Sequence, residues 1–505
     1  METVGRWVVG PVPVRGSGSV PGAAQAVGSR RGLEPADAAR LVRRAKRALV
    51  RAARADEAET LSSLLRRHLG ADASGLDVVE ESWPPYEHVN VQTALVAWCD
   101  QPDVQHEAVG VIGFQHRMFG LAELLADDDV EDPFGPRPGN IARVNVASGP
   151  DGAVLPCVQC AIYLVTEGTR RAALLVRGPE PMSGESLTVQ AVSGHPGWAA
   201  ELTARLRALA AEHNVFRGQV LSFGGEVFGS EQTLLQFHRR PSLAPEGLVL
   251  PAETLAAVHH QVLEVARHKR QLLAAGQHLK RGLLLYGPPG VGKTHTVRHL
   301  IGSLTDTTVI QLTGNALHLV AEACSVARAL QPAMVVIEDV DLIAEDRGMH
   351  PGEHPMLFQL LNEMDGLAED ADVVFVLTTN RADLLEPALA ARPGRIDQAV
   401  ELTLPDAAAR RQLFELYRGG LVVDDSRLDD VLARTGGVTA SFLKELLRRA
   451  AVLSAAEAGD TDRPLSVTAD QLDRALAELQ DTSNAMTRVL LGASHAERKD
   501  LDDLD

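Results

Sequence analysis

The sequence predicts an α/β fold, in which a parallel sheet with helices on both faces is preceded by an α+β domain and followed by an all-helical segment. Between residues 246 and 405, five short apolar runs (GLLLYG, TVIQLTG, MVVIEDVD, VVFVLTTN and QAVELTL) alternate with stretches of helical character. Such alternation is typical of a parallel sheet covered on both sides. Residues 406–480 have a helical pattern throughout, with Asp406 as the expected N-cap after Pro405, and residues 79–245 mix strand and helix patterns.

The composition favours a globular protein of a reducing compartment. Of the 505 residues, 45% are hydrophobic and 23% are charged, which is ordinary for a globular chain. The net charge of −18 argues against a broad nucleic-acid surface. Only four cysteines are present, too few for a disulfide framework, and no apolar run approaches the roughly 18–20 residues of a membrane span. We therefore expect a cytoplasmic protein without a membrane span.

The two ends of the chain have a different character. Residues 1–34 are rich in Gly, Pro, Val and Ser and are expected to be disordered, and residues 481–505 form a polar tail. Residues 35–70 form a basic helical segment, without Gly or Pro from Ala36 to His68. Its basic residues are interpreted first as a solvated helix face, and alternatively as a contact with nucleic acid, acidic lipid or an acidic partner.

Residues 79–245 are expected to form an N-terminal α+β domain. A β-hairpin is indicated by the segments VQCAIYLV and RRAALLVRG, which flank the turn TEGT. A third strand is expected at SLTVQAVS, an amphipathic helix at GWAAELTARLRALAAEHN, and a short strand at GQVLSF. Cys157 and Cys160 form a lone CxxC in the hairpin. Strand packing is favoured over a zinc site, because zinc needs four ligands and residues three apart in a strand face opposite sides.

The segment GPPGVGKT fits the phosphate-loop pattern G-x-x-x-x-G-K-[ST] (Walker A), and it lies between a predicted strand and a predicted helix. Its glycines let backbone amides approach phosphate oxygens, Lys293 supplies a positive charge to the β- and γ-phosphates, and Thr294 offers a hydroxyl to Mg²⁺. The motif therefore predicts that ATP and Mg²⁺ bind here. The expected nucleotide contacts are Gly287, Pro288, Pro289, Gly290, Val291, Gly292, Lys293, Thr294 and His295.

Further along the chain stand residues suited to phosphoryl transfer. Glu338 and Asp339 follow the apolar run 334–337, where a carboxylate for the Mg²⁺ shell and a base for water are needed. Asn380 ends the fourth run, where an amide can orient the attacking water. Arg392 and Arg395 flank a Pro-Gly pair in ARPGR and suit an arginine finger that reaches a neighbouring subunit.

Residues 247–479 resemble the AAA family of ATPases. The resemblance rests on LKRGLLLYGPPGVGKT, QLLNEMDGL, TTNRADLLEPAL, ARPGRID and GGVTASFLKELL. It implies an AAA+ module with the sheet order 5-1-4-3-2, a C-terminal helical lid and a homo-oligomeric ring, usually hexameric. It also implies that Asn380 is the first sensor and that Arg392 and Arg395 act across subunits. Gly437, at the start of the segment ending at Ser441, is implied to lie near the adenine.

The order of the two acids departs from the family pattern, which has Asp before Glu. Counting from Pro332 and Ala333 places Glu338 at the Mg²⁺-shell position and Asp339 at the base position. Glu is one methylene longer than Asp, so the exchanged pair can reach similar places. A working ATPase is favoured over a slow or inactive nucleotide switch.

Two further stretches depart from related patterns. The interval GNALHLVAEACSVARALQP is shorter than in ring unfoldases and lacks their aromatic gripping residue, so Leu319 or Val320 are the available substitutes. HPGEH, from His350 to His354, matches the zinc-peptidase pattern H-x-x-E-H. A loop is favoured there, because its Pro-Gly pair would break the helix that such a site needs. With no H-E-x-x-H or peptidase domain following the lid, a membrane AAA protease is not expected.

The function expected from the sequence is an ATP hydrolase that assembles as a ring and remodels a protein partner chosen by the N-terminal domain. Two alternatives remain: an ATP-gated oligomeric scaffold with little turnover, and a nucleic-acid remodelling AAA protein that uses the basic helix of residues 35–70.

Overall fold

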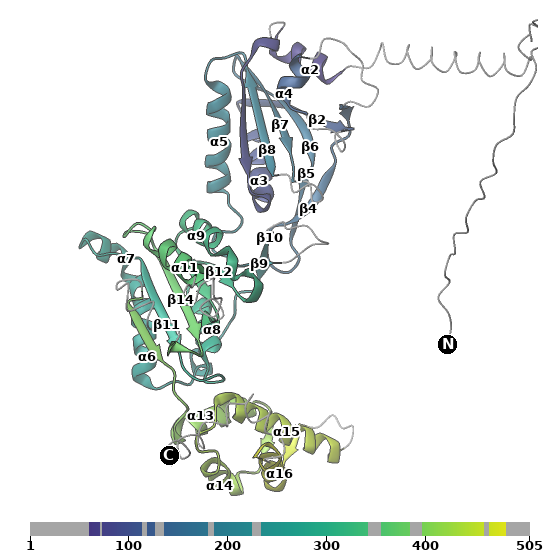
Figure 1. The fold of residues 1–505 in the computed structure, drawn as a ribbon. Helices are drawn as coiled ribbons and strands as arrows, with labels where there is room; N and C mark the ends of the chain where they lie inside the picture. The colour runs from purple at the N-terminus through teal and green to yellow at the C-terminus, as the bar shows by residue number, and fades with distance from the viewer. Residues whose placement is uncertain are drawn as a thin grey trace, which may run out of the picture. The chain divides into compact units, whose positions relative to one another are not determined.

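The structure, a computed structural model, describes residues 60–70, 73–113, 119–126, 136–179, 186–224, 234–341, 355–383, 396–458 and 464–480. Two sheets organise these residues, as Figure 1 shows: a six-stranded sheet in the N-terminal part and a seven-stranded sheet that carries the glycine-rich loop. Two shorter pairings, β4 with β5 and β16 with β17, accompany them.

The six-stranded sheet has the order β1-β8-β7-β6-β2-β3, and its neighbouring strands are all antiparallel. Its strands are β1 (Val78–Trp83), β2 (Val104–Ile112), β3 (Arg137–Gly139), β6 (Cys160–Glu167), β7 (Arg170–Arg177) and β8 (Leu187–Ser193). The predicted hairpin is present as β6 and β7, with Glu167 opposite Arg170, and the predicted third strand is β8.

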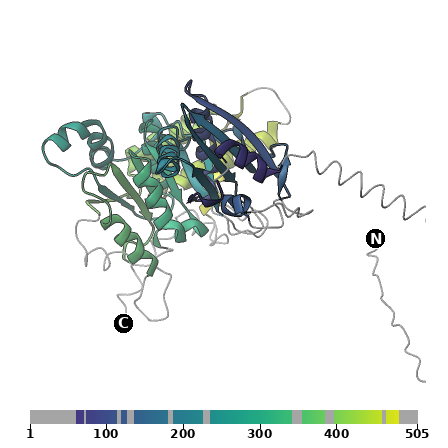
Figure 2. The ribbon, with the colours of Figure 1, turned by 90° about the horizontal axis from the view of Figure 1, so that it is seen from above.

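Helices cover both faces of this sheet, which Figure 2 shows from above. α3 (His88–Cys99) and α5 (Trp198–Glu212) pack on the face that carries Tyr163 and Val165. α2 (Leu61–Leu69) and α4 (Leu121–Ala126) pack on the other face, because successive strand residues point to opposite sides. The rest of the predicted basic helix, residues 35–59, lies outside the described residues.

The second sheet has the order β10-β9-β12-β13-β14-β11-β15. Its strands are β9 (Val220–Gly224), β10 (Leu234–His238), β11 (Arg281–Tyr286), β12 (Thr308–Leu312), β13 (Ala333–Ile337), β14 (Val373–Thr379) and β15 (Gln398–Glu401). Every neighbouring pair is parallel except β9 with β10. Numbered along the chain from β11, the last five strands lie in the order 5-1-4-3-2. This strand order is the one that the resemblance implies.

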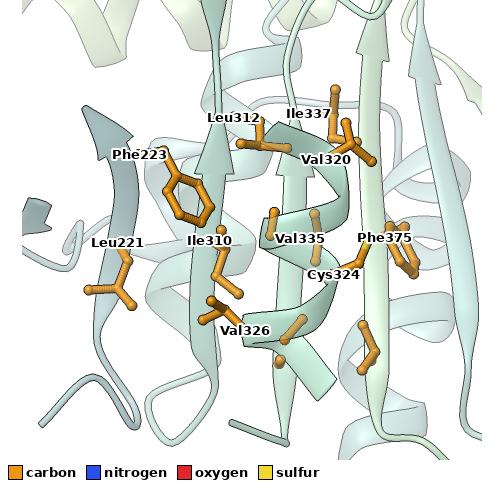
Figure 3. Close-up of a cluster of buried hydrophobic side chains, with 14 of the residues drawn as sticks. Leu221, Phe223, Ile310, Leu312, Val320, Cys324, Val326, Val335, Ile337 and Phe375 are labelled. Atoms are coloured by element: carbon orange, nitrogen blue, oxygen red, sulfur yellow. The ribbon is translucent and has the colours of Figure 1, made fainter. Parts of the chain in front are cut away.

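The strand expected at GQVLSF is present as β9, but it lies in a different sheet from the one the sequence predicted. It was assigned to the N-terminal α+β domain, whereas it pairs in parallel with β12. Figure 3 shows Leu221 and Phe223 of β9 beside Ile310 and Leu312 of β12. The pairing buries these apolar side chains in one continuous core, which a lone strand would leave in water.

Helices also cover both faces of the second sheet. α9 (Val320–Ala329) and α11 (Pro355–Asp365) pack on the face that carries Val335 and Ile337. α6 (Ala252–His259), the π-helical turn η4 (His260–Glu264) and α8 (Lys293–Ser303) pack on the face that carries Met334 and Val336. α7 (Val265–Ala274) continues η4 and has no buried residue.

The helical segment after the sheet has a core of its own. Its elements are α13 (Ala407–Arg418), β16 (Val422–Val423), α14 (Leu428–Ala433), α15 (Ala440–Ala458), β17 (Ser466–Val467) and α16 (Ala469–Gln480). The predicted N-cap at Asp406 is confirmed, because its Oδ1 accepts a hydrogen bond of 2.7 Å from the backbone amide of Ala409.

Cys157 and Cys160 lie on two strands rather than one. Cys157 lies in β5 (Val154–Val158), opposite Val144 of β4 (Arg143–Ala147), and Cys160 begins β6. The two side chains pack into different apolar clusters, and burial raises the pKa of each thiol, to about 11 for Cys157 and about 12 for Cys160. Thiols that face separate cores do not form a common metal site.

Candidate functional site

The glycine-rich loop, residues 287–292, connects β11 to α8, as the sequence predicts. Gly287 has a φ of +143°, and a Cβ there would lie 2.2 Å from the carbonyl oxygen of Leu402. Gly290 has a φ of +80°, and a Cβ there would lie 3.0 Å from Oγ of Ser441. Both positions therefore require glycine for conformation and for space.

Lys293 is the buried cation of the loop, with 7% of its surface exposed. Its Nζ donates hydrogen bonds to the carbonyls of Gly287 (2.7 Å) and Pro288 (2.9 Å) and to Oδ1 of Asn380 (2.8 Å). Burial lowers the pKa of Lys293 to about 8, because it disfavours the charged ammonium, while the charges of Asp339 and Asp341 partly oppose this shift.

Thr294 and Glu338 come together at the start of α8. The hydroxyl of Thr294 donates a hydrogen bond of 2.8 Å to Oε2 of Glu338. Strand alternation explains this contact, because Glu338 continues the face of β13 that carries Met334 and Val336 and packs against α8. A hydroxyl and a carboxylate oxygen at this spacing fit Mg²⁺, which prefers oxygen ligands and retains several waters.

Asp339 and Asn380 complete the cluster. Nδ2 of Asn380 donates to Oδ1 of Asp339 at 3.3 Å, while Oδ1 of Asn380 accepts from Lys293. One amide therefore joins the buried cation to the second acid. The predicted residues Lys293, Thr294, Glu338, Asp339 and Asn380 all meet at the carboxyl edge of the parallel sheet, where ligands bind in open α/β sheets.

Asp341 and the threonines that end β14 form a supporting layer that the sequence analysis did not assign. Asp341 is 9% exposed, and its Oδ1 accepts from the hydroxyl of Thr379 (2.9 Å) and the amide of Asn380 (3.3 Å). Thr378 accepts from the amide of Asp339 through Oγ1 (3.1 Å) and from the amide of Val340 through its carbonyl (2.9 Å). In the sequence, the acid at residue 341 and the paired threonines before Asn380 are the signals for this layer.

His295 contacts the segment between β10 and β11. Its Nε2 and the carbonyl oxygen of Gly247 lie 3.0 Å apart, so the ring N–H donates this hydrogen bond. The bond links the first turn of α8 to the beginning of the domain.

The helical segment touches the loop through Ser441. Its backbone amide donates to the carbonyl of Gly290 at 3.3 Å, and its hydroxyl donates to the same oxygen at 3.4 Å. Gly437 itself is a left-handed turn residue with a φ of +75°. The sequence analysis singled out Gly437, whereas the contact with the loop comes from Ser441, at the other end of the same short segment.

Val320 is wrong as a substitute for the missing aromatic gripping residue, because it is buried, and Leu319 is half-buried. The interval after β12 forms a 3₁₀ turn, η5 (Gly314–Leu319), that leads directly into α9. Val320 is 2% exposed, and Leu319 packs against the core formed by β9, β12 and α9. Side chains that complete a core are not presented to a partner.

Five predicted features lie outside the described residues: residues 1–34, most of the basic helix, the HPGEH segment from His350 to His354, the pair Arg392 and Arg395, and the polar tail of residues 481–505.

Comparison with known proteins gives an independent view of the sheet region. Residues 283–404 match the family described as "ATPase family associated with various cellular activities (AAA)". ATP-dependent zinc metalloprotease FtsH 2 of Sphaerobacter thermophilus is 35% identical over 241 residues, which cover 45% of this chain and 37% of that protein. FtsH of Mycobacterium leprae is 33% identical over 215 residues, covering 40% of this chain and 27% of that protein.

A third relative, FtsH of Ruminiclostridium cellulolyticum, is 33% identical over 209 residues and matches 34% of its own length. The chain thus spans about a third of the length of these relatives. No helix among the described residues is both long enough and apolar enough to cross a membrane.

Proposed function

We propose that this protein hydrolyses ATP with Mg²⁺ and uses the cycle, as a homo-oligomeric ring, to remodel a protein partner, in keeping with the match of residues 283–404 to the AAA family of ATPases. The observation that carries the proposal is the meeting of a buried lysine, a hydroxyl–carboxylate pair and an acid–amide pair at one edge of the sheet. These are the groups that phosphoryl transfer to water requires.

Each residue of the site has a separate proposed role in the reaction. Residues 287–292 cradle the phosphates with backbone amides, and Lys293 leaves its carbonyl partners to neutralise the β- and γ-phosphates. Thr294 and Glu338 would hold Mg²⁺, which neutralises charge on the transferring phosphate when bound. Asp339 accepts a proton from the attacking water, which Asn380 orients. The water oxygen bonds to the γ-phosphorus, and the bond to the β–γ bridging oxygen breaks, giving ADP and phosphate.

His295 and Gly437 complete the nucleotide site in this proposal. The bond from His295 to the carbonyl of Gly247 joins the segment before β11 to the helix that follows the loop. Ser441 brings the lid to Gly290 from the other side. The adenine would lie between these two segments, so lid movement would follow nucleotide occupancy.

The site of one subunit would be completed by the next subunit in the ring. Arg392 and Arg395 are proposed as arginine fingers for the neighbouring γ-phosphate. The N-terminal α+β domain, residues 79–245, is proposed to choose the protein partner. We place the protein in the cytoplasm, since its four cysteines are all free thiols.

The remodelling step is proposed to proceed without an aromatic gripping loop. The residues at the corresponding interval are built into the core through η5 and α9. The FtsH relatives are named zinc metalloproteases. We do not propose peptidase activity for this chain, whose sequence contains no H-E-x-x-H.

Phosphate release from ATP tests the proposal directly. Wild type should release phosphate in a Mg²⁺-dependent reaction, and Lys293→Ala should abolish it. Thr308→Val serves as a matched control, because Thr308 is a buried strand threonine at the opposite end of the sheet. Nucleotide-driven assembly without phosphate release from wild type would favour the oligomeric scaffold instead.

A nucleic-acid remodelling function remains as an alternative because of the basic segment before residue 60. It predicts that polynucleotide stimulates turnover and that truncation abolishes the stimulation. The truncation should end at residue 59, since Leu61, Leu64 and Leu65 of α2 belong to the core of the six-stranded sheet. Equal turnover with and without polynucleotide would exclude this alternative.

A further inference from the structure

The backbone at Asp339 is unusual. Its φ is +53°, in the left-handed region that residues other than glycine seldom adopt. Asp and Asn enter this region more readily than other side chains, because their short polar groups bond to nearby backbone. The exchanged acid order thus places the more tolerant of the two acids at the position that needs a left-handed backbone.

This turn also decides where the acid points. Along β13, Val335 and Ile337 face the α9 side of the sheet, and Met334 and Val336 face the α8 side. A continued strand would carry residue 338 to the α8 side, as observed, and residue 339 to the α9 side, away from the loop. The left-handed turn instead brings Oδ1 of Asp339 to within 3.3 Å of Nδ2 of Asn380.

Thr378 holds the turn in place from the neighbouring strand. Its side chain is 1% exposed, its hydroxyl accepts from the amide of Asp339, and its carbonyl accepts from the amide of Val340. Both amides that follow Glu338 are therefore bonded to one residue. The next residue, Thr379, bonds to Asp341, so the ends of β13 and β14 are joined at successive positions.

We propose that Thr378 is a positioning residue, which fixes a left-handed turn at Asp339 and so allows an aspartate to serve where the family pattern has a glutamate. The proposal rests on the proposed ATPase function and extends it to the reason for the Glu338–Asp339 order. Glu338 uses its extra methylene to reach Thr294, and Asp339 depends on the turn to reach Asn380.

The test compares Thr378→Val with Thr378→Ser. Valine keeps the branched shape and removes the acceptor for the Asp339 amide, whereas serine keeps the acceptor. We expect kcat for ATP hydrolysis to fall about 10- to 100-fold in Thr378→Val, since a displacement of about 1 Å costs on the order of 100-fold. Affinity for ATP should stay within about twofold of wild type, because Lys293 and the loop are unchanged.

Thr308→Val is the matched control for a merely structural effect. Thr308 is also fully buried in the same sheet, and its hydroxyl both donates to Leu330 (2.9 Å) and accepts from Gly218 (3.0 Å). The substitution Thr308→Val should destabilise the protein and leave kcat unchanged. Equal kcat in Thr378→Val and wild type, or an equal loss in Thr308→Val, would overturn the proposal.

Reversal of the acids gives a second test. The double variant Glu338→Asp with Asp339→Glu restores the family order, yet it should hydrolyse ATP more slowly than wild type. Glutamate at residue 339 would have to adopt the left-handed region, and aspartate at residue 338 would fall short of Thr294. A faster double variant would contradict the inference.

Crystal structures separate this inference from the proposed function. If wild type released no phosphate, the proposed ATPase function would fail. The conformation of residue 339 in a crystal structure of Thr378→Val would still test the positioning role of Thr378. In Thr378→Val, residue 339 should leave the left-handed region and lose its contact with Asn380. An unchanged φ and contact in Thr378→Val would refute the positioning role.

Discussion

At the scale of single residues, Lys293 determines how the site responds to nucleotide. Its three acceptors are two carbonyls of the loop and the amide oxygen of Asn380, so ATP must compete with contacts inside the protein. The exchange is favourable because phosphate oxygens carry charge, and charged acceptors form stronger hydrogen bonds than neutral ones. Binding of ATP therefore frees Asn380 from Lys293, as its proposed role in orienting water requires.

The lowered pKa of Lys293 makes ATP affinity depend on pH. With a pKa of about 8 in the free protein, the ammonium is charged below pH 8 and becomes neutral above it. Bound phosphate favours the charged form, so affinity should be constant below pH 8 and fall about tenfold per pH unit above it. A fluorescent ATP analogue titrated from pH 7 to 9.5 would measure this.

Lys293→Arg provides the control for the pH titration. The guanidinium stays charged across this range, so the affinity of the variant should be independent of pH. An equal pH dependence in the arginine variant would assign the effect to another group.

At the scale of elements, β9 and η5 together alter one edge of the nucleotide-binding sheet. β9 adds to β12, and the residues of η5 and α9 pack beside Phe223 and Leu221 in the same cluster. Figure 3 shows α9 in front of the sheet, and its Val320, Cys324 and Val326 belong to the same buried cluster. An interval that carries a gripping loop in ring unfoldases is in this chain part of the core.

Truncation of Phe223 should destabilise the nucleotide-binding domain. Phe223 is 5% exposed, and Phe→Ala in a core costs about 3–5 kcal/mol. We expect Phe223→Ala to lower the urea midpoint of the unfolding transition that ATP stabilises, because β9 belongs to that sheet. Val452→Ala, at a 55% exposed position, should change the free energy of unfolding by less than about 0.5 kcal/mol.

The unfolding transition that shifts in Phe223→Ala tests the assignment of β9 to the second sheet. A loss of stability confined to a transition that ATP does not affect would place Phe223 in the core of the N-terminal domain, contrary to the pairing with β12.

At the scale of the whole molecule, the proposed ring can be tested by mixing inactive variants. Lys293→Ala lacks the phosphate contact, and the double variant Arg392→Ala with Arg395→Ala lacks the proposed fingers. If the arginines act across subunits, an equimolar mixture should regain activity. Roughly a quarter of its interfaces would pair an intact loop with intact fingers.

The two variants measured separately provide the baseline for this experiment. Activity in the mixture no greater than their mean would show that the arginines act within their own subunit or not at all. Sedimentation of each variant with ATP would establish that both still assemble.

The chemistry of the site could be predicted from the sequence because each part of it is local. The phosphate loop is one continuous motif, and the spacing from Pro332 fixes the register of Glu338 and Asp339. The alternating pattern of strands and helices also indicates a parallel sheet, so its carboxyl edge, with Asn380, follows. The hairpin β6–β7, the strand β8 and the N-cap at Asp406 are likewise local patterns, and they are found where predicted.

Tertiary structure alone decided which segments became neighbours. The pairing of β9 with β12 joins residues far apart in the chain, and no short pattern encodes the sheet to which a short apolar strand adds. The same holds for Thr378, whose hydroxyl meets Asp339 only because β13 and β14 lie side by side. The sequence by itself determined which polar and charged groups meet at the candidate site, since these follow from residue type and spacing. The orientation of Asp339 was decided by a backbone turn that hydrogen bonds from a neighbouring strand hold in place.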